Sequence, residues 1–249
     1  MNMIFEKKLI KTVLLFFIGL LIVSCSKDDP AGSLSISAKA TLTKSANKTV
    51  SAKNAVTEVT ISDFLVNIEE FELEMDDNEQ DDDNEQWDDD GYYDFEDDLE
   101  LEGPFELNLM QGQVSFLGVD VPNGTFEEIE FKFDESTDAT SDLFGKSVLI
   151  KGTIDGTPFI FWHDFDDEIE VDFEEPQFDL VVQNGPNSVV IDFDLSLLFD
   201  TVNGIDLSQA TDNNEDGTFE ISPSDNDGNN ELAHQLKDKF KTLIDLLDD

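Results

Sequence analysis

Two short loops near the end of the chain have the residue types and spacing of a calcium site. Residues 212–217 read DNNEDG, with Asp, Asn and Asp at alternate positions before the glycine, and residues 225–228 read DNDG. Calcium takes six to eight hard oxygen ligands, and alternate side chains of such a loop point toward one centre. We therefore expect calcium as the ion, with these candidate ligands: Asp212, Asn214, Asp216, Asp225 and Asp227.

A complete calcium loop of the EF-hand type is not present. The twelfth position, which normally supplies a bidentate glutamate, is Pro223. The alternative interpretation is a pair of Asn/Asp-Gly turns that lead into the next element. The sequence leaves both open.

A longer acidic run joins two strand-like segments. Residues 76–91 contain ten carboxylates in sixteen positions and no base. Only Asp88-x-Asp90-Gly91 approaches the spacing of a calcium loop, so Asp88 and Asp90 are weaker candidate ligands. A solvated insertion, placed at residues 76–102, accounts for the same run, because loops of this length are often functional or disordered.

Two tryptophans are weak candidates for stacking on a ligand such as a sugar ring. Trp162 lies in the stretch FWHDFDD, and Trp87 lies inside the acidic run. Enzymatic patterns are absent from the sequence, which contains no GxSxG elbow, no HExxH pair, no Gly-rich phosphate loop and no arginine. We therefore predict a protein that is not an enzyme.

The N-terminus predicts export and lipidation. Lysines at positions 7, 8 and 11 precede an apolar run from Val13 to Val23, the length of a signal-peptide core. The run ends in Ile22-Val23-Ser24-Cys25, which resembles the lipobox of bacterial lipoproteins, and Cys25 is the single cysteine, so it has no disulfide partner. The resemblance implies a signal peptide at residues 1–24, acylation of Cys25 and a tether at residues 25–32.

The residues that follow the cysteine indicate where the protein is sent. Ser26-Lys27-Asp28-Asp29-Pro30 resembles the export signal of lipoproteins that face outward from the outer membrane. We expect outer-membrane attachment through the lipid anchor and exposure to the cell exterior. The formal net charge of −45 excludes nucleic acid as a natural partner, because phosphates would be repelled. The expected partner is an extracellular ligand, glycan or protein.

Hydrophobic residues recur with a period of two along most of the chain. Residues 129–133, 169–173 and 189–195 alternate apolar with polar or acidic side chains, the pattern of half-buried antiparallel strands. Asp155-Gly156 predicts a hairpin. The alternation of apolar and polar residues shifts by one position at Glu69-Glu70, which predicts a β-bulge. The expected fold is mainly β: an antiparallel sandwich or open barrel of about eight to ten strands over residues 33–209.

The end of the chain changes period. After the Asp/Asn/Gly-rich loop, placed at residues 210–230, apolar residues recur at steps of three and four. This spacing predicts a C-terminal helix over residues 231–249, with its apolar stripe on the sheet and its lysines against acidic strand faces. The stripe consists of Leu232, Leu236, Phe240, Leu243 and Leu247.

Several stretches together resemble a family of bacterial lipoprotein domains of uncharacterised function, domain of unknown function 4382. The stretches are VTISDFLVNIEEFELE, GPFELNL, VPNGTFEEIEFKFD, IKGTIDGTPFIF and VVIDFDLSLLF, across about residues 56–200. The resemblance implies an all-β extracytoplasmic domain on a lipid anchor, with no established activity. We expect a non-enzymatic, surface-exposed module that binds a ligand or partner and is stabilised by calcium. A fimbrillin-like adhesin or structural subunit and a carbohydrate-binding accessory lipoprotein remain alternatives.

Overall fold

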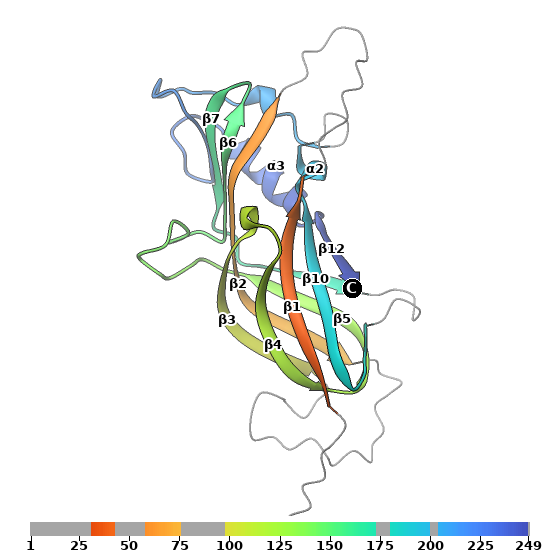
Figure 1. The fold of residues 1–249 in the computed structure, drawn as a ribbon. Helices are drawn as coiled ribbons and strands as arrows, with labels where there is room; N and C mark the ends of the chain where they lie inside the picture. Colours follow the sequence, from red (N-terminus) through yellow and green to blue (C-terminus); the bar gives the residue numbers. More distant parts are fainter. Residues whose placement is uncertain (1–30, 43–57, 76–97, 173–179, 200–203, 249) are drawn as a thin grey trace, which may run out of the picture.

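Two β-sheets pack face to face, and helix α3 (Asn230–Phe240) covers one end of the space between them (Figure 1). The computed structural model describes residues 31–42, 58–75, 98–172, 180–199 and 204–248. The first sheet has the strand order β12-β10-β1-β4. Its strands are β1 (Ala31–Thr41), β4 (Val114–Pro122), β10 (Gly185–Asp194) and β12 (Ile244–Asp248).

The second sheet has the order β11-β7-β6-β2-β5-β8, with β3 also paired to β2 and β9 to β5. Its strands are β2 (Val59–Met75), β3 (Asp98–Asn108), β5 (Gly124–Phe133), β6 (Val148–Ile154), β7 (Thr157–His163), β8 (Asp167–Asp172), β9 (Leu180–Val182) and β11 (Phe219–Ile221). Short helices α2 (Leu195–Leu198), η1 (Leu109–Gln111) and η2 (Leu207–Gln209) connect the strands. The predicted mainly-β, sandwich-like fold is confirmed, with one difference: the sheets are mixed, because β1–β10 and β11–β7 are parallel pairs. Ten strands, β1 to β10, lie in the region where eight to ten were expected, and β11 and β12 follow it.

The long strand β2 changes partner at its middle. Its first half pairs with β6 and its second half with β5. The register shifts between Ile68 and Glu70 in the pairing with β5 and also in the pairing with β3. The predicted bulge is therefore confirmed. It returns Ile68 and Phe71 to the same face, where both are fully buried. At the change of partner, the main-chain N–H of Asn67 donates to Ser147 O (2.9 Å), and its side-chain Nδ2 donates to Asp134 O (3.0 Å). These two bonds join β2 to the ends of β5 and β6.

The hairpin between β6 and β7 forms at the predicted Asp155-Gly156 turn. Both residues have positive φ, 50° and 82°, as a two-residue turn of this type requires. Asp155 also accepts the amide N–H of Glu58 through Oδ1 at 2.7 Å. The turn is thereby tied to the start of β2, and the three strands β7, β6 and β2 are held in register.

Aromatic side chains fill the core at the end covered by α3. Phe240 on α3 is fully buried and contacts four phenylalanine rings at centroid distances of 5.8 to 6.1 Å. The rings belong to Phe64, Phe133, Phe165 and Phe193, which come from both sheets and from the β7–β8 turn. Leu232 and Leu236 are also buried, so the predicted packing of the helical stripe on the sheet is confirmed for these residues.

Two predicted boundaries are wrong. The C-terminal helix ends at Phe240 instead of continuing to residue 249, and residues 244–248 form β12, which pairs with Val189–Phe193 of β10. The edge of β10 offers these residues backbone hydrogen bonds, which override the helical spacing of Leu243 and Leu247. The acidic insertion also ends earlier than residue 102, because β3 begins at Asp98.

Candidate functional site

Four neighbouring strands, in the order β3-β2-β5-β8, bring acidic side chains into register across the second sheet. The central row has one glutamate from each strand, and the adjacent rows continue the pattern with one lysine. We call this surface the acidic face. Its members are Glu70, Glu72, Glu74, Glu100, Glu102, Glu128, Glu130, Lys132, Glu168 and Glu170.

The core fixes which way these side chains point. Leu73, Phe131 and Ile169 alternate with the glutamates along their strands and are buried between the sheets. Because successive side chains of a strand point to opposite faces, the glutamates lie on the outer face of the sheet. The bulge before Glu70 keeps this phase along the second half of β2. The hydrophobic pattern therefore sets the acidic face.

Like charges dominate the centre of the acidic face. Lys132 pairs with Glu70 at 3.7 Å, and this carboxylate raises the pKa of the lysine. Partial burial, a side-chain hydrogen bond with Glu130 and the nearby charge of Glu170 raise the pKa of Glu128 to about 7. With a pKa of about 7, Glu128 keeps its proton to a higher pH than an ordinary carboxyl group, because burial and the neighbouring glutamates disfavour its charged form.

Three of these glutamates could hold a cation. Oxygen atoms of Glu128, Glu130 and Glu170 lie within 4.8 Å of one another. Three converging carboxylates supply the hard oxygen ligands that calcium and magnesium prefer, and a bound cation would relieve the repulsion that raises the pKa of Glu128.

The predicted Asp/Asn/Gly loop folds as two linked half-loops. In the first, Asp212 accepts the amide N–H of Asp216 through Oδ1 (3.1 Å) and that of Gly217 through Oδ2 (2.9 Å). Asn214 Oδ1 also accepts the Asp216 amide (2.9 Å). Glu215 and Gly217 have positive φ, 61° and 89°, which lets the chain close this turn. The three candidate ligands Asp212, Asn214 and Asp216 thus lie on one tight turn.

The second half-loop is tied to the first by a buried carboxylate. Asp227 is fully buried, and it accepts the amides of Asn214 (Oδ1, 3.2 Å) and Glu220 (Oδ2, 2.9 Å). Asp225 Oδ1 accepts three successive amides at 2.8 to 3.1 Å, just before α3. Asn229 does not cap α3 with its side chain; its Nδ2 donates to the carbonyls of residues 211 and 220. All five predicted residues therefore organise one loop, in which main-chain amides are the partners of their oxygens.

In the part of the chain that the structure describes, the loop aspartates do not form a group of three whose carboxylate oxygens lie within 4.8 Å of one another. Calcium binding by this loop stays a prediction. A carboxylate oxygen has two lone pairs, so those that accept one amide, such as Asp212 Oδ2, keep one available for a cation, whereas Asp225 Oδ1 with three amides does not.

The tryptophan candidates fall in different parts of the chain. Trp162 lies on β7 opposite Leu149 of β6, and its side chain is half-exposed. Lys146 Nζ lies 5.8 Å from the centre of its ring. Trp87, Asp88 and Asp90 lie outside the described residues, as does Cys25 with its predicted signal peptide.

The acidic face was not among the residues singled out in the sequence. Alternating acids are visible in FELE, EIEF and EIEV, but any half-exposed strand shows such alternation. What the sequence does not show is that β3 and β5 both pair with β2 and that β8 pairs with β5, which places the acids of four strands in shared rows. Strand order and register were the missing information.

No family model, curated protein or solved structure matches this chain. Among the described residues, no helix is long and apolar enough to cross a membrane.

Proposed function

We propose that the chain is a surface-exposed, lipid-anchored bacterial lipoprotein of the uncharacterised type named above, and that it acts as a non-enzymatic binding module. Support for the anchor comes from the signal-peptide and lipobox pattern that ends at Cys25. Support for binding comes from the acidic face, where nine glutamates and one lysine lie in shared rows on the outside of the second sheet.

The charge of the acidic face determines the class of ligand. Its carboxylates repel anions and attract cations, so the ligand is a divalent metal ion or a partner that presents a basic surface. Calcium suits the convergence of Glu128, Glu130 and Glu170, and it also suits the oxygen donors of the Asp212 loop. Calcium at either place lowers the self-repulsion of a chain with a net charge of −45.

The test is a calcium titration of the chain from Ser26 onward, followed by calorimetry and thermal unfolding, with magnesium as the competing ion. Glu130→Gln with Glu170→Gln should abolish binding at the acidic face, and Asp212→Asn with Asp216→Asn should abolish binding at the loop. Glu135→Gln, an exposed change away from both places, is the matched control. Weak heat that disappears in added salt, unchanged by either pair of substitutions, would show diffuse screening and refute a specific site.

One observation favours carbohydrate binding as a second candidate function. Trp162 is half-exposed on the outside of β7, and Lys146 lies over its ring, so an aromatic side chain and a cation occur together on this surface, where a glycan that displaces the lysine could stack. Binding on a glycan array that is lost in Trp162→Ala and retained in Glu130→Gln would support this function. An array without any bound glycan would count against it.

A further inference from the structure

Helix α3 is attached to the end of β7 by a cluster of titratable groups that the proposed function does not use. His234 on α3 contacts the ring of His163, the last residue of β7, at a centroid distance of 5.7 Å. Lys237 of α3 and Lys241, the residue that follows the helix, both pair with Asp167, at 2.8 and 3.1 Å. The helix is therefore held by one imidazole contact and one carboxylate with two lysines, in addition to the burial of Phe240.

His163 is the unusual member of this cluster. Its side chain is buried, with 6% of the residue exposed, and Nδ1 accepts the amide N–H of Asp164 at 3.0 Å. An Nδ1 that accepts a hydrogen bond carries no proton, so the proton of the neutral ring is on Nε2. Nε2 is buried and has no hydrogen-bond partner among the described residues. The ring is thus held neutral, in one tautomer, at the contact between strand and helix.

We propose that His163 is an acid-sensitive latch: proton uptake at Nδ1 breaks its bond to the Asp164 amide and releases α3 from the end of β7. The protonated Nδ1–H and the amide N–H of Asp164 are both donors, and they face each other across 3.0 Å. One of them must turn away. Asp167, which pairs with both lysines, lies three residues further along the chain, at the start of β8.

Charged groups on both sides of the ring affect its affinity for a proton. From the β7–β8 turn, Asp164 Oδ1 lies 3.4 Å from Nδ1 and attracts a proton, and Asp167 acts in the same sense at longer range. From α3, Lys237 and His234 repel it. Burial is the largest effect and lowers the pKa of His163. Asp164 is well exposed, so water screens its attraction, and burial favours the neutral ring while α3 is docked.

Linkage gives the size of the effect. When α3 is docked, His163 binds a proton less readily than it does when exposed, where its pKa is about 6.5. Docking is therefore strongest above this pH and weakens as the pH falls below it. With one proton taken up on release, the opening equilibrium rises by at most about tenfold per pH unit, between about pH 6.5 and the lowered pKa of the docked ring.

The experiment is hydrogen exchange of the amides in α3 between pH 7.5 and pH 5.0, corrected for intrinsic rates, on the full secreted chain. In the wild type, protection should be constant above about pH 6.5 and fall below it, by up to about tenfold per pH unit. His163→Asn keeps an acceptor near the Nδ1 position and does not titrate, so its protection should stay constant. Gln235→Asn is the control: it changes an exposed side chain of α3 outside the cluster and should retain the wild-type dependence.

Imidazole ¹⁵N chemical shifts of the wild type provide a second readout that does not depend on either variant folding. The latch requires a neutral His163 with its proton on Nε2, and a titration midpoint that coincides with the loss of α3 protection. The proposal is overturned if His163→Asn shows the wild-type pH dependence, if the proton resides on Nδ1, or if His163 titrates while α3 stays protected.

Discussion

Replacement of Glu130 by glutamine should stabilise the protein, although it removes a group from the middle of an ordered surface. Glu130 lies in the central row of the acidic face, and it contributes to the raised pKa of Glu128 through a hydrogen bond and through its charge. Glutamine keeps the size and the hydrogen-bonding capacity of the side chain and removes the charge. The variant therefore isolates the repulsion from the packing.

The magnitude follows from the pKa of Glu128. A rise in the pKa of a carboxyl group from 4.5 to about 7 would lower the stability of the folded state by about 3 kcal/mol at high pH if the group were shielded from water. Glu128 is only partly buried, so solvent screening reduces this to about 1 kcal/mol. Glu130 accounts for part of the pKa shift, and we expect Glu130→Gln to increase the free energy of unfolding by about 0.5 to 1 kcal/mol at pH 8.

The sign depends on pH. A raised folded-state pKa means that the folded protein holds this proton more strongly than the unfolded chain does, so the associated stability is complete below about pH 4.5 and is lost as the pH rises through about 7. The gain from Glu130→Gln should therefore be present at pH 8 and nearly absent at pH 4.5. It should also shrink in 0.5 M salt, because screening weakens repulsion between half-exposed charges.

Urea unfolding at the two pH values measures this difference, with Glu135→Gln as the control for loss of one exposed negative charge. A ¹³C titration of the Glu128 carboxyl in both proteins provides the pKa directly. An equal change in stability at pH 8 and pH 4.5, or a gain in the control as large as that in Glu130→Gln, would refute local repulsion on the acidic face as the cause.

Three further changes test how the sandwich is held together, each by urea unfolding at pH 7. Phe240→Ala should cost about 3 to 5 kcal/mol, because a fully buried ring leaves a cavity among four others; a cost below 1 kcal/mol would mean that α3 contributes little to the core. Asn67→Ala should cost about 1 to 3 kcal/mol, because it removes the Nδ2 bond to Asp134 O and leaves that carbonyl without this donor, and Asn67→Asp, which cannot donate, should cost at least as much. Gly152→Ala should be strongly destabilising and weaken the β2–β6 pairing seen by hydrogen exchange, since a Cβ there would lie 1.9 Å from Thr60 O; a neutral result would show that β2 can move aside.

Local signals in the sequence predicted the local features of the fold. Asp155-Gly156 predicted a hairpin because few dipeptides adopt positive φ at both positions, and both residues do so. The slip at Glu69-Glu70 predicted a bulge, because only an extra residue returns Ile68 and Phe71 to one face. These conclusions needed no knowledge of distant strands.

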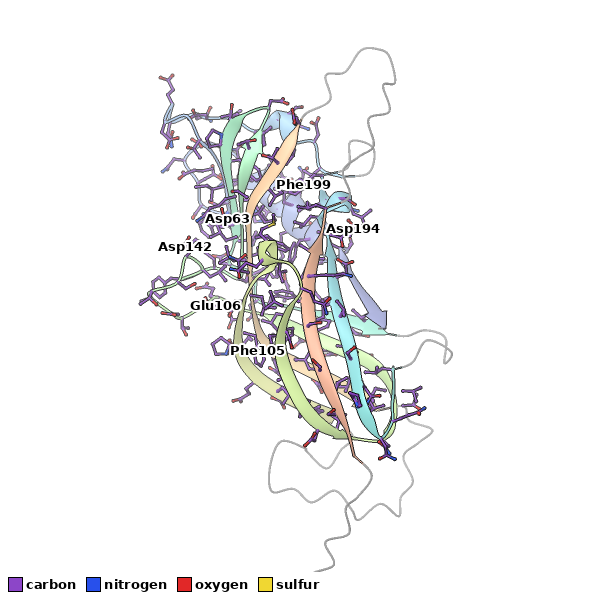
Figure 2. All side chains as sticks on the ribbon, in the orientation of Figure 1. Asp63, Phe105, Glu106, Asp142, Asp194 and Phe199 are labelled. Carbon is purple, nitrogen blue, oxygen red and sulfur yellow. The ribbon has the colours of Figure 1, made fainter. Side chains whose placement is uncertain are left out.

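Features that depend on distant pairing could not be predicted in this way. Leu243 and Leu247 have helical spacing after Phe240, yet residues 244–248 are a strand because the edge of β10 is available to them. Figure 2 shows a similar case at Glu106 and Asp142, which lie near each other on β3 and in the β5–β6 connection. Glu106 accepts the hydroxyl of Ser141 at 2.6 Å, a contact between residues 35 positions apart that no spacing rule reveals.

The pairing of distant strands is also what forms the acidic face, so this surface emerged only from the structure. Its carboxyl groups affect how the protein responds to pH. The carboxyl group of Glu128 stabilises the fold as the pH falls through about 7, because the folded state holds its proton more strongly. The imidazole of His163 acts in the opposite sense, because its pKa is lowered and docking of α3 weakens below about pH 6.5. Acidification therefore strengthens the sheet that bears the acidic face while it loosens the helix at the other end of the sandwich. Burial raises the pKa of Asp167, but its hydrogen bonds with Lys237 and Lys241 outweigh burial and leave this pKa lowered, so protonation of this carboxylate at still lower pH also weakens the attachment of α3.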